Sequence, residues 1–224
     1  MQTGYWKSDN SIYYLISPSQ IQTAVFNAHS VGLKIYPWIA SQLTDGEVID
    51  IGTSSLRQNA FNSMVNIVKT YGFDGIADDV EELDYNVMND YVAYYNGAAS
   101  AMHAIGKQYF TTVIAYLPPA MGSALFSQIK VDRIQIMLYT YPPDQLTTMF
   151  KEHIDFILRY SSSPVGLAIH SDGPYQPLST SMSWIDQQLA TGTPTNKLAG
   201  IDIFWVIAMN TNQWNTWSNW NTKN

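Results

Sequence analysis

Six of the eighteen carboxylates in this sequence lie between Asp74 and Asp84. Like charges held close together raise one another's pKa values, so such a cluster is either a solvated rim or a place where altered protonation is used. Asp79 and Glu81 are two residues apart, and alternate residues of a strand project to the same side of a sheet. One carboxylate can then stay ionised while its neighbour keeps a proton, as a general acid at neutral pH requires. The spacing therefore predicts acid–base chemistry by Asp79 and Glu81.

A strand must position these two residues, and the sequence predicts strands and helices in alternation. Apolar, β-branched and aromatic runs indicate buried parallel strands at 12–17, 33–40, 72–80, 108–116, 132–139, 164–170 and 200–206. Helical patterns lie between them at 18–30, 54–71, 85–105, 120–129, 144–160 and 179–190, with a last one near the C-terminus. Alternation with short connections implies βαβ units and a parallel sheet.

The seven predicted strands are one short of a (β/α)8 barrel, the TIM barrel. Either the first strand lies near residues 3–7 or the chain lacks it. An open, doubly wound sheet is the alternative, but no Gly-rich phosphate-binding loop follows an early strand. We therefore expect an α/β fold, a TIM (β/α)8 barrel with an incomplete or atypical first strand. No linker divides the chain, so residues 1–224 are expected to form a single domain.

Composition excludes several classes of partner and chemistry. A net charge of -7 and a pI near 4.8 argue against nucleic acid and anionic membranes. The chain has no cysteine, which excludes disulfides and thiol catalysis. No apolar run is long enough for a membrane span, and the N-terminus shows no signal-peptide pattern. Seven Trp and fifteen Tyr either fill a core or stack on the apolar faces of sugars, and composition leaves both open.

Histidines and metal ligands add little to this chemistry. His29, His103 and His153 lie in helical patterns and are expected on the surface, whereas His170 ends a predicted strand and is a candidate cleft residue. No nucleophile motif accompanies His170. The acidic cluster lacks the EF-hand spacing and no His–Glu–His grouping is present, so no cofactor and no metal are predicted.

Segment 73–81, Phe-Asp-Gly-Ile-Ala-Asp-Asp-Val-Glu, resembles the fourth-strand signature of family 18 glycoside hydrolases, DGxDxDxE. Four positions match: Asp74, Gly75, Asp79 and Glu81. Ala77 stands where the family has a further Asp. Asp78 occupies a usually apolar position and faces away from Asp79, so it does not substitute for the missing carboxylate. A basic group on the next strand is its candidate partner.

Two further segments follow in the family's order. Residues 137–139, Met-Leu-Tyr, resemble the Met-x-Tyr of strand six, and the Pro-Pro pair at 142–143 is similar to small, hevamine-like members. Residues 199–205, which end in Trp205, resemble the last strand. The resemblance thus covers most of the chain, from the predicted strand at 33–40 to Trp205.

The resemblance implies substrate-assisted catalysis with retention. Glu81 would protonate the glycosidic oxygen, while the substrate's own acetamido carbonyl attacks the anomeric carbon; in the usual scheme a second carboxylate does this. Asp79 would orient the acetamido group, Tyr139 would hydrogen-bond its oxygen, and Trp205 would stack beneath the sugar. The remaining predicted site residues bind substrate or support the strand: Met137, Tyr116 and Tyr141 for binding, and Asp74 and Gly75 for support.

The resemblance therefore implies a chitinase that cleaves β-1,4-linked N-acetylglucosamine. Only about thirty residues separate His170 from Gly200, which leaves no room for an inserted α+β domain and predicts a shallow groove. The chain is expected to act as a secreted monomer on chitin or N-acetylglucosamine-containing oligosaccharides. Three alternatives stay open: an endo-β-N-acetylglucosaminidase on N-glycans, a carbohydrate-binding barrel without catalysis, and a metal-dependent barrel enzyme.

Overall fold

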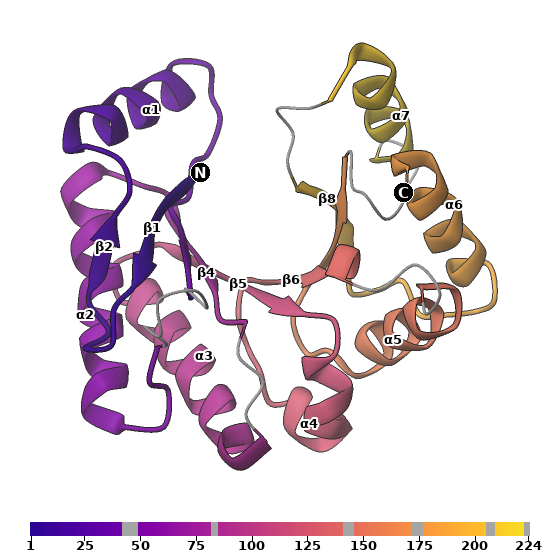
Figure 1. The fold of residues 1–224 in the computed structure, drawn as a ribbon, viewed down its shortest axis with the longest axis horizontal. Helices are drawn as coiled ribbons and strands as arrows, with labels where there is room; N and C mark the ends of the chain where they lie inside the picture. The colour runs from indigo at the N-terminus through magenta and orange to yellow at the C-terminus, as the bar shows by residue number, and fades with distance from the viewer. Residues whose placement is uncertain (42–48, 82–84, 141–145, 172–176, 205–208, 222–224) are drawn as a thin grey trace. The chain divides into compact units, whose positions relative to one another are not determined.

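The computed structural model describes residues 1–41, 49–81, 85–140, 146–171, 177–204 and 209–221 (Figure 1). The strands are β1 (Gln2–Trp6), β2 (Ile12–Tyr14), β3 (Trp38–Ala40), β4 (Gly75–Asp79), β5 (Gln108–Ile114), β6 (Arg133–Met137), β7 (Val165–His170) and β8 (Leu198–Phe204). The α-helices are α1 (Pro18–Ser30), α2 (Ser54–Tyr71), α3 (Met88–His103), α4 (Leu117–Phe126), α5 (Leu146–Tyr160), α6 (Leu178–Leu189) and α7 (Thr211–Asn221). Two short 3-10 helices are η1 (Tyr85–Val87) and η2 (Leu138–Thr140).

The strands pair in the order β2-β1-β3-β4-β5-β6-β7-β8, which is chain order except that β1 and β2 exchange places. The chain forms two compact units, the first of residues 1–112 and 129–132 and the second of residues 113–128 and 133–224. In the first unit β1, β3, β4 and β5 pair in parallel. In the second, β6, β7 and β8 do the same. Helices alternate with these strands, so the fold is α/β of the TIM-barrel type.

The start of the sheet is atypical, as predicted, and it also corrects one expected strand. The first parallel strand is β1, in the region of residues 3–7. The run at 12–17 is not a buried parallel strand: β2 covers only Ile12–Tyr14 and pairs antiparallel with β1. A turn at Asn10, whose φ of 58° is left-handed, reverses the chain, and only Ile12 of β2 is buried. Exposed aromatic side chains at Tyr13 and Tyr14 had given this hairpin arm the apolar appearance of a core strand.

Helices α1 and α2 begin and end at the residues that the sequence indicated. Ser17 caps α1 in a capping box with Gln20, which satisfies N–H groups that the first turn leaves unpaired. Helix α2 ends at Gly72, whose φ of 76° is the left-handed conformation that glycine adopts without strain. Local sequence therefore determines the limits of both helices.

Large rings fill the core of the first unit. Its largest fully buried side chains include Trp6 of β1, Tyr109 of β5 and three tyrosines of α3, Tyr91, Tyr94 and Tyr95. Helices α2 and α3 pack side by side along this core. The aromatic content that composition left ambiguous thus serves packing in this unit, with phenol hydroxyls brought into an otherwise apolar interior.

In the second unit, a glycine makes room for an ion pair. Arg133 of β6 and Asp202 of β8 join across the intervening strand, with 2.5 Å between Nη2 and Oδ1. A Cβ atom at Gly166 of β7 would overlap both side chains. Glycine is therefore required at this position for the pair to cross β7.

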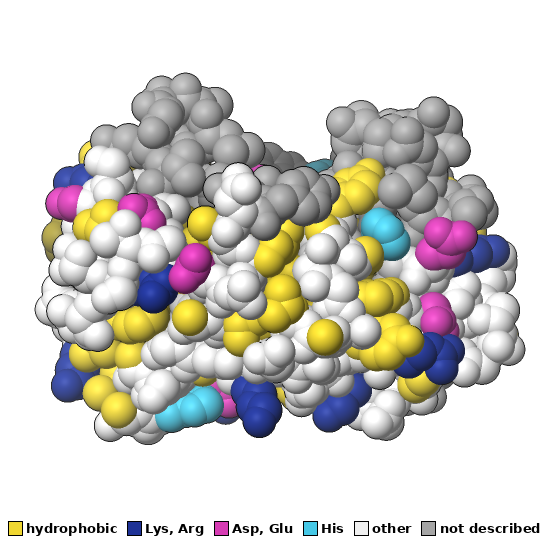
Figure 2. Space-filling view, turned by 90° about the horizontal axis from the view of Figure 1, so that it is seen from below, with side chains coloured by type: hydrophobic (Ala, Val, Ile, Leu, Met, Phe, Trp, Pro, Cys, Tyr) yellow, Lys and Arg dark blue, Asp and Glu magenta, His cyan; other side chains and the backbone are white. Residues whose placement is uncertain are grey.

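Charged side chains are sparse on the surface drawn in Figure 2, where they stand singly or in small groups among uncharged ones, in keeping with a charged content of 13%. Within the described ranges, no helix combines the length and the apolar character needed to cross a membrane.

Candidate active site

Strand β4 brings the predicted pair to the carboxyl end of the sheet in the first unit. It lies between β3 and β5, and its last residue, Asp79, is paired with Ala40 on one side and Thr112 on the other. Asp79 is fully buried, whereas Glu81, two residues beyond the strand, is half-buried. The two carboxylates thus occupy different environments at a strand end, the edge at which barrel proteins carry their catalytic groups.

Asp78, between Ala77 and Asp79, is fully buried, and none of the described residues gives it a basic partner. The Trp6 indole N–H donates to its Oδ1 at 2.8 Å. The hydroxyls of Tyr94 and Tyr109 both donate to its Oδ2, at 2.6 and 3.0 Å. The expected cation on the next strand is therefore wrong: the neighbouring strand supplies a phenol, and the other two donors come from β1 and α3.

Burial dominates the protonation of Asp78. Removal from water raises its pKa to about 6, although the three hydrogen bonds act in the opposite direction. Burial also raises the pKa of Tyr94 and of Tyr109 well above the ordinary value, so both phenols remain protonated donors. Asp78 is thus a buried carboxyl group whose described side-chain donors, an indole and two phenols, are all neutral.

Asp74, just before β4, has the opposite environment. Its Oδ2 accepts the Ile35 backbone N–H at 2.8 Å and lies 3.0 Å from Nε2 of His29, at the end of α1. Burial acts to raise the pKa of Asp74, but the hydrogen bonds from Ile35 and His29 outweigh it and hold the pKa below its ordinary value. At Gly75, a Cβ atom would overlap the carbonyl oxygen of Gln108, so only glycine lets β4 and β5 approach this closely.

The same arrangement occurs a second time in this unit. Oδ2 of Asp132, just before β6, accepts the backbone N–H of Tyr109 at 2.8 Å. It also lies 2.7 Å from Nε2 of His103, the last residue of α3. His29 and His103 are thus surface residues, as expected, and each carries an aspartate partner.

In the second unit, aromatic rings gather at the carboxyl ends of three strands. Tyr139 of η2, directly after β6, stacks on Phe204 at the end of β8, with 4.9 Å between centroids. His170, which ends β7, contacts both rings edge-on at 5.9 and 5.6 Å. Sequence reasoning selected Tyr139 and His170 and missed Phe204, although Phe204 is the register partner of His170.

The other predicted binding residues lie at or just after the ends of β5 and β6, or outside the described residues. Met137 is buried within the second unit. Tyr116, at the start of α4, packs edge-on against His153 of α5, with 5.7 Å between ring centroids, and His153 is half-buried. Trp205 and Tyr141 fall outside the described residues.

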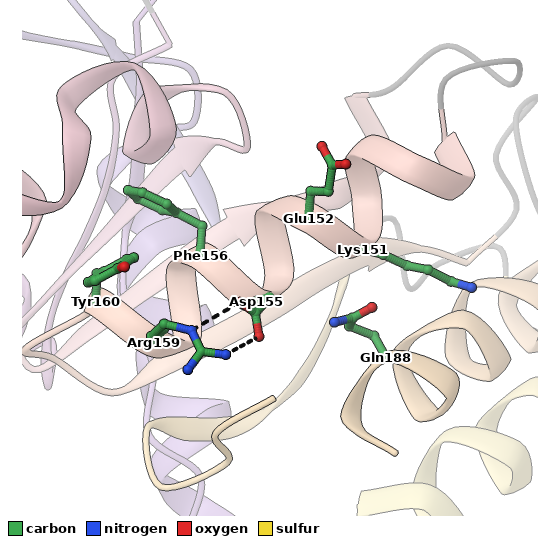
Figure 3. Close-up of a pocket in the computed structure, with 7 residues that line it drawn as sticks. All are labelled: Lys151, Glu152, Asp155, Phe156, Arg159, Tyr160 and Gln188. Atoms are coloured by element: carbon green, nitrogen blue, oxygen red, sulfur yellow. Dashed lines mark hydrogen bonds and ion pairs between the residues drawn. The ribbon is translucent and has the colours of Figure 1, made fainter. Parts of the chain in front are cut away.

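A hollow of about 430 Å³ lies on helices of the second unit, between α5 and α6 (Figure 3). Arg159 forms two hydrogen bonds to Asp155, one turn earlier on α5, at 2.8 and 3.1 Å. The other lining residues are Lys151, Glu152, Phe156, Tyr160 and Gln188. None of the predicted site residues lines this hollow, which belongs to the helical layer and not to the strand ends. Among the residues that the structure describes, no group of three or more His, Asp or Glu side chains could hold a metal ion.

Fold and strand-end carboxylates together define a TIM-barrel-type protein with a candidate acid–base site. No family model matches the sequence, and no curated protein matches it either. Solved structures share its fold. A class V chitinase from Pseudomonas fluorescens Pf-5 has a TM-score of 0.71 and 15% identity, over 96% of this chain and 89% of that one. A chitinase from Bacteroides thetaiotaomicron gives 0.68 and 13%, over 96% and 83%.

A chitinase from Chromobacterium violaceum ATCC 12472 has a TM-score of 0.57 and 16% identity, over 75% of this chain. Only 59% of that longer chain is covered. These likenesses confirm the α/β TIM-barrel fold.

Proposed function

We propose that this protein is a glycoside hydrolase of the chitinase type, cleaving β-1,4-linked N-acetylglucosamine. The observation that carries the proposal is the placement of Asp79 and Glu81 at the carboxyl end of β4, in a fold shared with chitinases. The order of the sequence segments adds support, since the residues 137–139 and 199–205 follow in the order of family 18.

In the proposed reaction, Glu81 is the general acid and then the general base. It is half-buried, so a substrate can reach it while its carboxyl group is partly shielded from water. The substrate's acetamido oxygen forms the bond to the anomeric carbon as the bond to the leaving oxygen breaks. Glu81 gives its proton to the leaving oxygen. It then takes a proton from water as the water oxygen bonds to the anomeric carbon and the bond from that carbon to the acetamido oxygen breaks. Asp79 orients the acetamido group and balances its developing positive charge.

In this proposal the sugar is bound by the residues that the resemblance selects. Tyr139 hydrogen-bonds the acetamido oxygen and Trp205 stacks beneath the ring, with Met137, Tyr116 and Tyr141 as the further binding residues. Asp74 and Gly75 support β4 through the contacts described above. We further propose that residues 1–224 act as one catalytic domain, as a secreted monomer and without a cofactor.

Parallel assays of the wild type and Glu81→Gln on chitin oligosaccharides and on a high-mannose glycopeptide test this function. We expect turnover of chitin oligosaccharides, β-anomeric first products, and at least a hundredfold loss, on the order of that expected for a lost general acid, in Glu81→Gln. Glu152→Gln, an exposed carboxylate of α5, is the matched control and should retain full activity.

Each other outcome selects a different function. Cleavage of the glycopeptide alone identifies an endo-β-N-acetylglucosaminidase. Tight oligosaccharide binding without turnover by the wild type identifies a carbohydrate-binding barrel. Activity that a chelator abolishes identifies a metal-dependent enzyme.

A further inference from the structure

Asp78 is a buried acid that the proposed reaction does not use. Its three donors come from three separate elements: Trp6 from β1, Tyr94 from α3 and Tyr109 from β5. All four side chains are fully buried, so water does not compete for these bonds. Contacts from three directions fix both oxygens of the carboxyl group, and with them the Cα–Cβ direction of Asp78.

Through the backbone of β4, the fixed orientation of Asp78 also constrains the proposed catalytic residues, Asp79 and Glu81. Side chains alternate along a strand, so the orientation of Asp78 determines that of Asp79 on the opposite face. The sheet holds the chain only as far as Asp79, whose carbonyl accepts the Ser41 N–H at 2.8 Å. Glu81 lies two residues further on. Its place therefore depends on how firmly the end of β4 is held.

We propose that Asp78 is a positioning residue: clamped by Trp6, Tyr94 and Tyr109, it sets where the end of β4 lies and where Asp79 and Glu81 point. This role rests on the proposed function for its effect on catalysis, because it acts through those two carboxylates. It also gives a physical reason for an acid at a position inside the core, where an apolar side chain would pack without desolvation.

Charge on Asp78 adds a second, measurable effect. In the described part of the chain, the titratable groups nearest to it are the hydroxyls of Tyr94, Tyr95 and Tyr109, while the carboxylate of Asp79 lies on the opposite face of β4. All three phenols stay neutral, so a change of charge in this cluster near pH 6 belongs to Asp78. If kcat depends on how Asp78 is held, kcat should change through about pH 6, and Asp78→Asn should lack that change.

Tyr94 and Tyr95 provide a matched pair for the experiment. Both are fully buried neighbours on α3, but the Tyr94 hydroxyl donates a hydrogen bond to Asp78, whereas the Tyr95 hydroxyl makes none to it. We would compare Tyr94→Phe, Tyr109→Phe and Asp78→Asn with Tyr95→Phe, measuring kcat, KM, the pH–rate profile and amide hydrogen exchange at residues 79–81. Each Phe variant keeps the ring and removes one hydroxyl, so all should fold.

A lowered kcat in Tyr94→Phe and Tyr109→Phe, by roughly tenfold with KM nearly unchanged, supports the positioning role, because small misplacements act on the transition state. Tyr95→Phe should then match the wild type. Equal kcat in Tyr94→Phe and Tyr95→Phe, with the pH–rate profile of Asp78→Asn the same as that of the wild type, overturns it while leaving the proposed function intact.

An inactive wild type contradicts the proposed function instead. Hydrogen exchange then tests whether Asp78 and its three donors hold the end of β4. Faster exchange at residues 79–81 in Tyr94→Phe than in Tyr95→Phe retains the clamp as the anchor of the strand end. Equal exchange in the two variants rejects the clamp as well.

Discussion

Asp74 and Asp78 lie four residues apart on one segment, yet their surroundings differ in water, charge and partners. Asp74 is partly exposed, accepts a backbone N–H and pairs with a histidine, and its pKa is lowered. Asp78 is fully buried among neutral donors, and its pKa is raised to about 6. The difference shows that hydrogen bonds alone do not decide the protonation of a carboxyl group. Burial reverses the direction of the shift even where the bonds outnumber those of the exposed residue.

Removing the buried carboxyl group should have the largest effect on stability. In Asp78→Ala, three buried donors lose their acceptor, and we expect the free energy of unfolding at pH 5 to fall by about 4 kcal/mol. Asp74→Ala should cost about 1 kcal/mol, since water can replace its partners. Urea denaturation of both variants measures the gap, and equal losses would contradict the contrast between the two ends of β4.

The pH dependence of stability should separate the same two residues. Asp78 holds its proton up to about pH 6 when folded, whereas the unfolded carboxyl group loses it near 3.8. The unfolding free energy should therefore fall by about 3 kcal/mol as pH rises from about 4 to 6, and then stay level. Asp78→Asn, with no proton to lose, should lack this decline. Denaturation at several pH values tests it, and an unchanged slope in Asp78→Asn would reject the raised pKa.

Asp74 should change the unfolding free energy with pH in the opposite direction to Asp78, and over a lower pH range. Its lowered pKa contributes stability above the unfolded value of 3.8, and this contribution is lost as pH falls through the folded pKa. Asp74→Asn should thus cost about 1 kcal/mol at pH 7 and progressively less toward pH 3. Asp132→Asn, which replaces the other aspartate bound to a backbone N–H and a histidine, serves as the matched control.

The two histidine contacts should contribute least. Both histidines are about half-exposed, so each of His29→Gln and His103→Gln should lower the unfolding free energy by no more than about 1 kcal/mol. Addition of 1 M salt should remove most of the difference from the wild type. Thermal unfolding at low and high salt measures it. A loss that salt leaves unchanged would assign these contacts to packing instead of charge.

Sequence could predict what depends on local pattern. The barrel-type alternation, the limits of α1 and α2, and the placement of Asp79 and Glu81 at the end of a buried strand all follow from periodicity, caps and alternation. The antiparallel strand β2 was predicted wrongly because its exposed tyrosines give it the aromatic pattern of a core strand. The assigned roles of Asp79 and Glu81 stay predictions.

Long-range partners could not be predicted in this way. Trp6 and Tyr109 are 72 and 31 residues from Asp78, and nothing local to any of them indicates the others. A buried acid among apolar neighbours was therefore assigned a cation, the commonest partner of a carboxylate, when folding supplied an indole and two phenols. The alignment of Phe204 with His170 likewise depends on the register of β7 with β8, which single-strand patterns leave open.

The two Asp–His contacts also determine which changes of length the chain can accept. Each ties the last turn of a helix, and the backbone of a residue that follows that helix, to the residue just before a strand: α1 and Ile35 to Asp74, and α3 and Tyr109 to Asp132. The contacts fix the positions of the residues that they join, but neither contact constrains the length of the chain between those residues. Insertions should therefore be accepted between the tied ends and resisted within a few residues of Asp74 or Asp132.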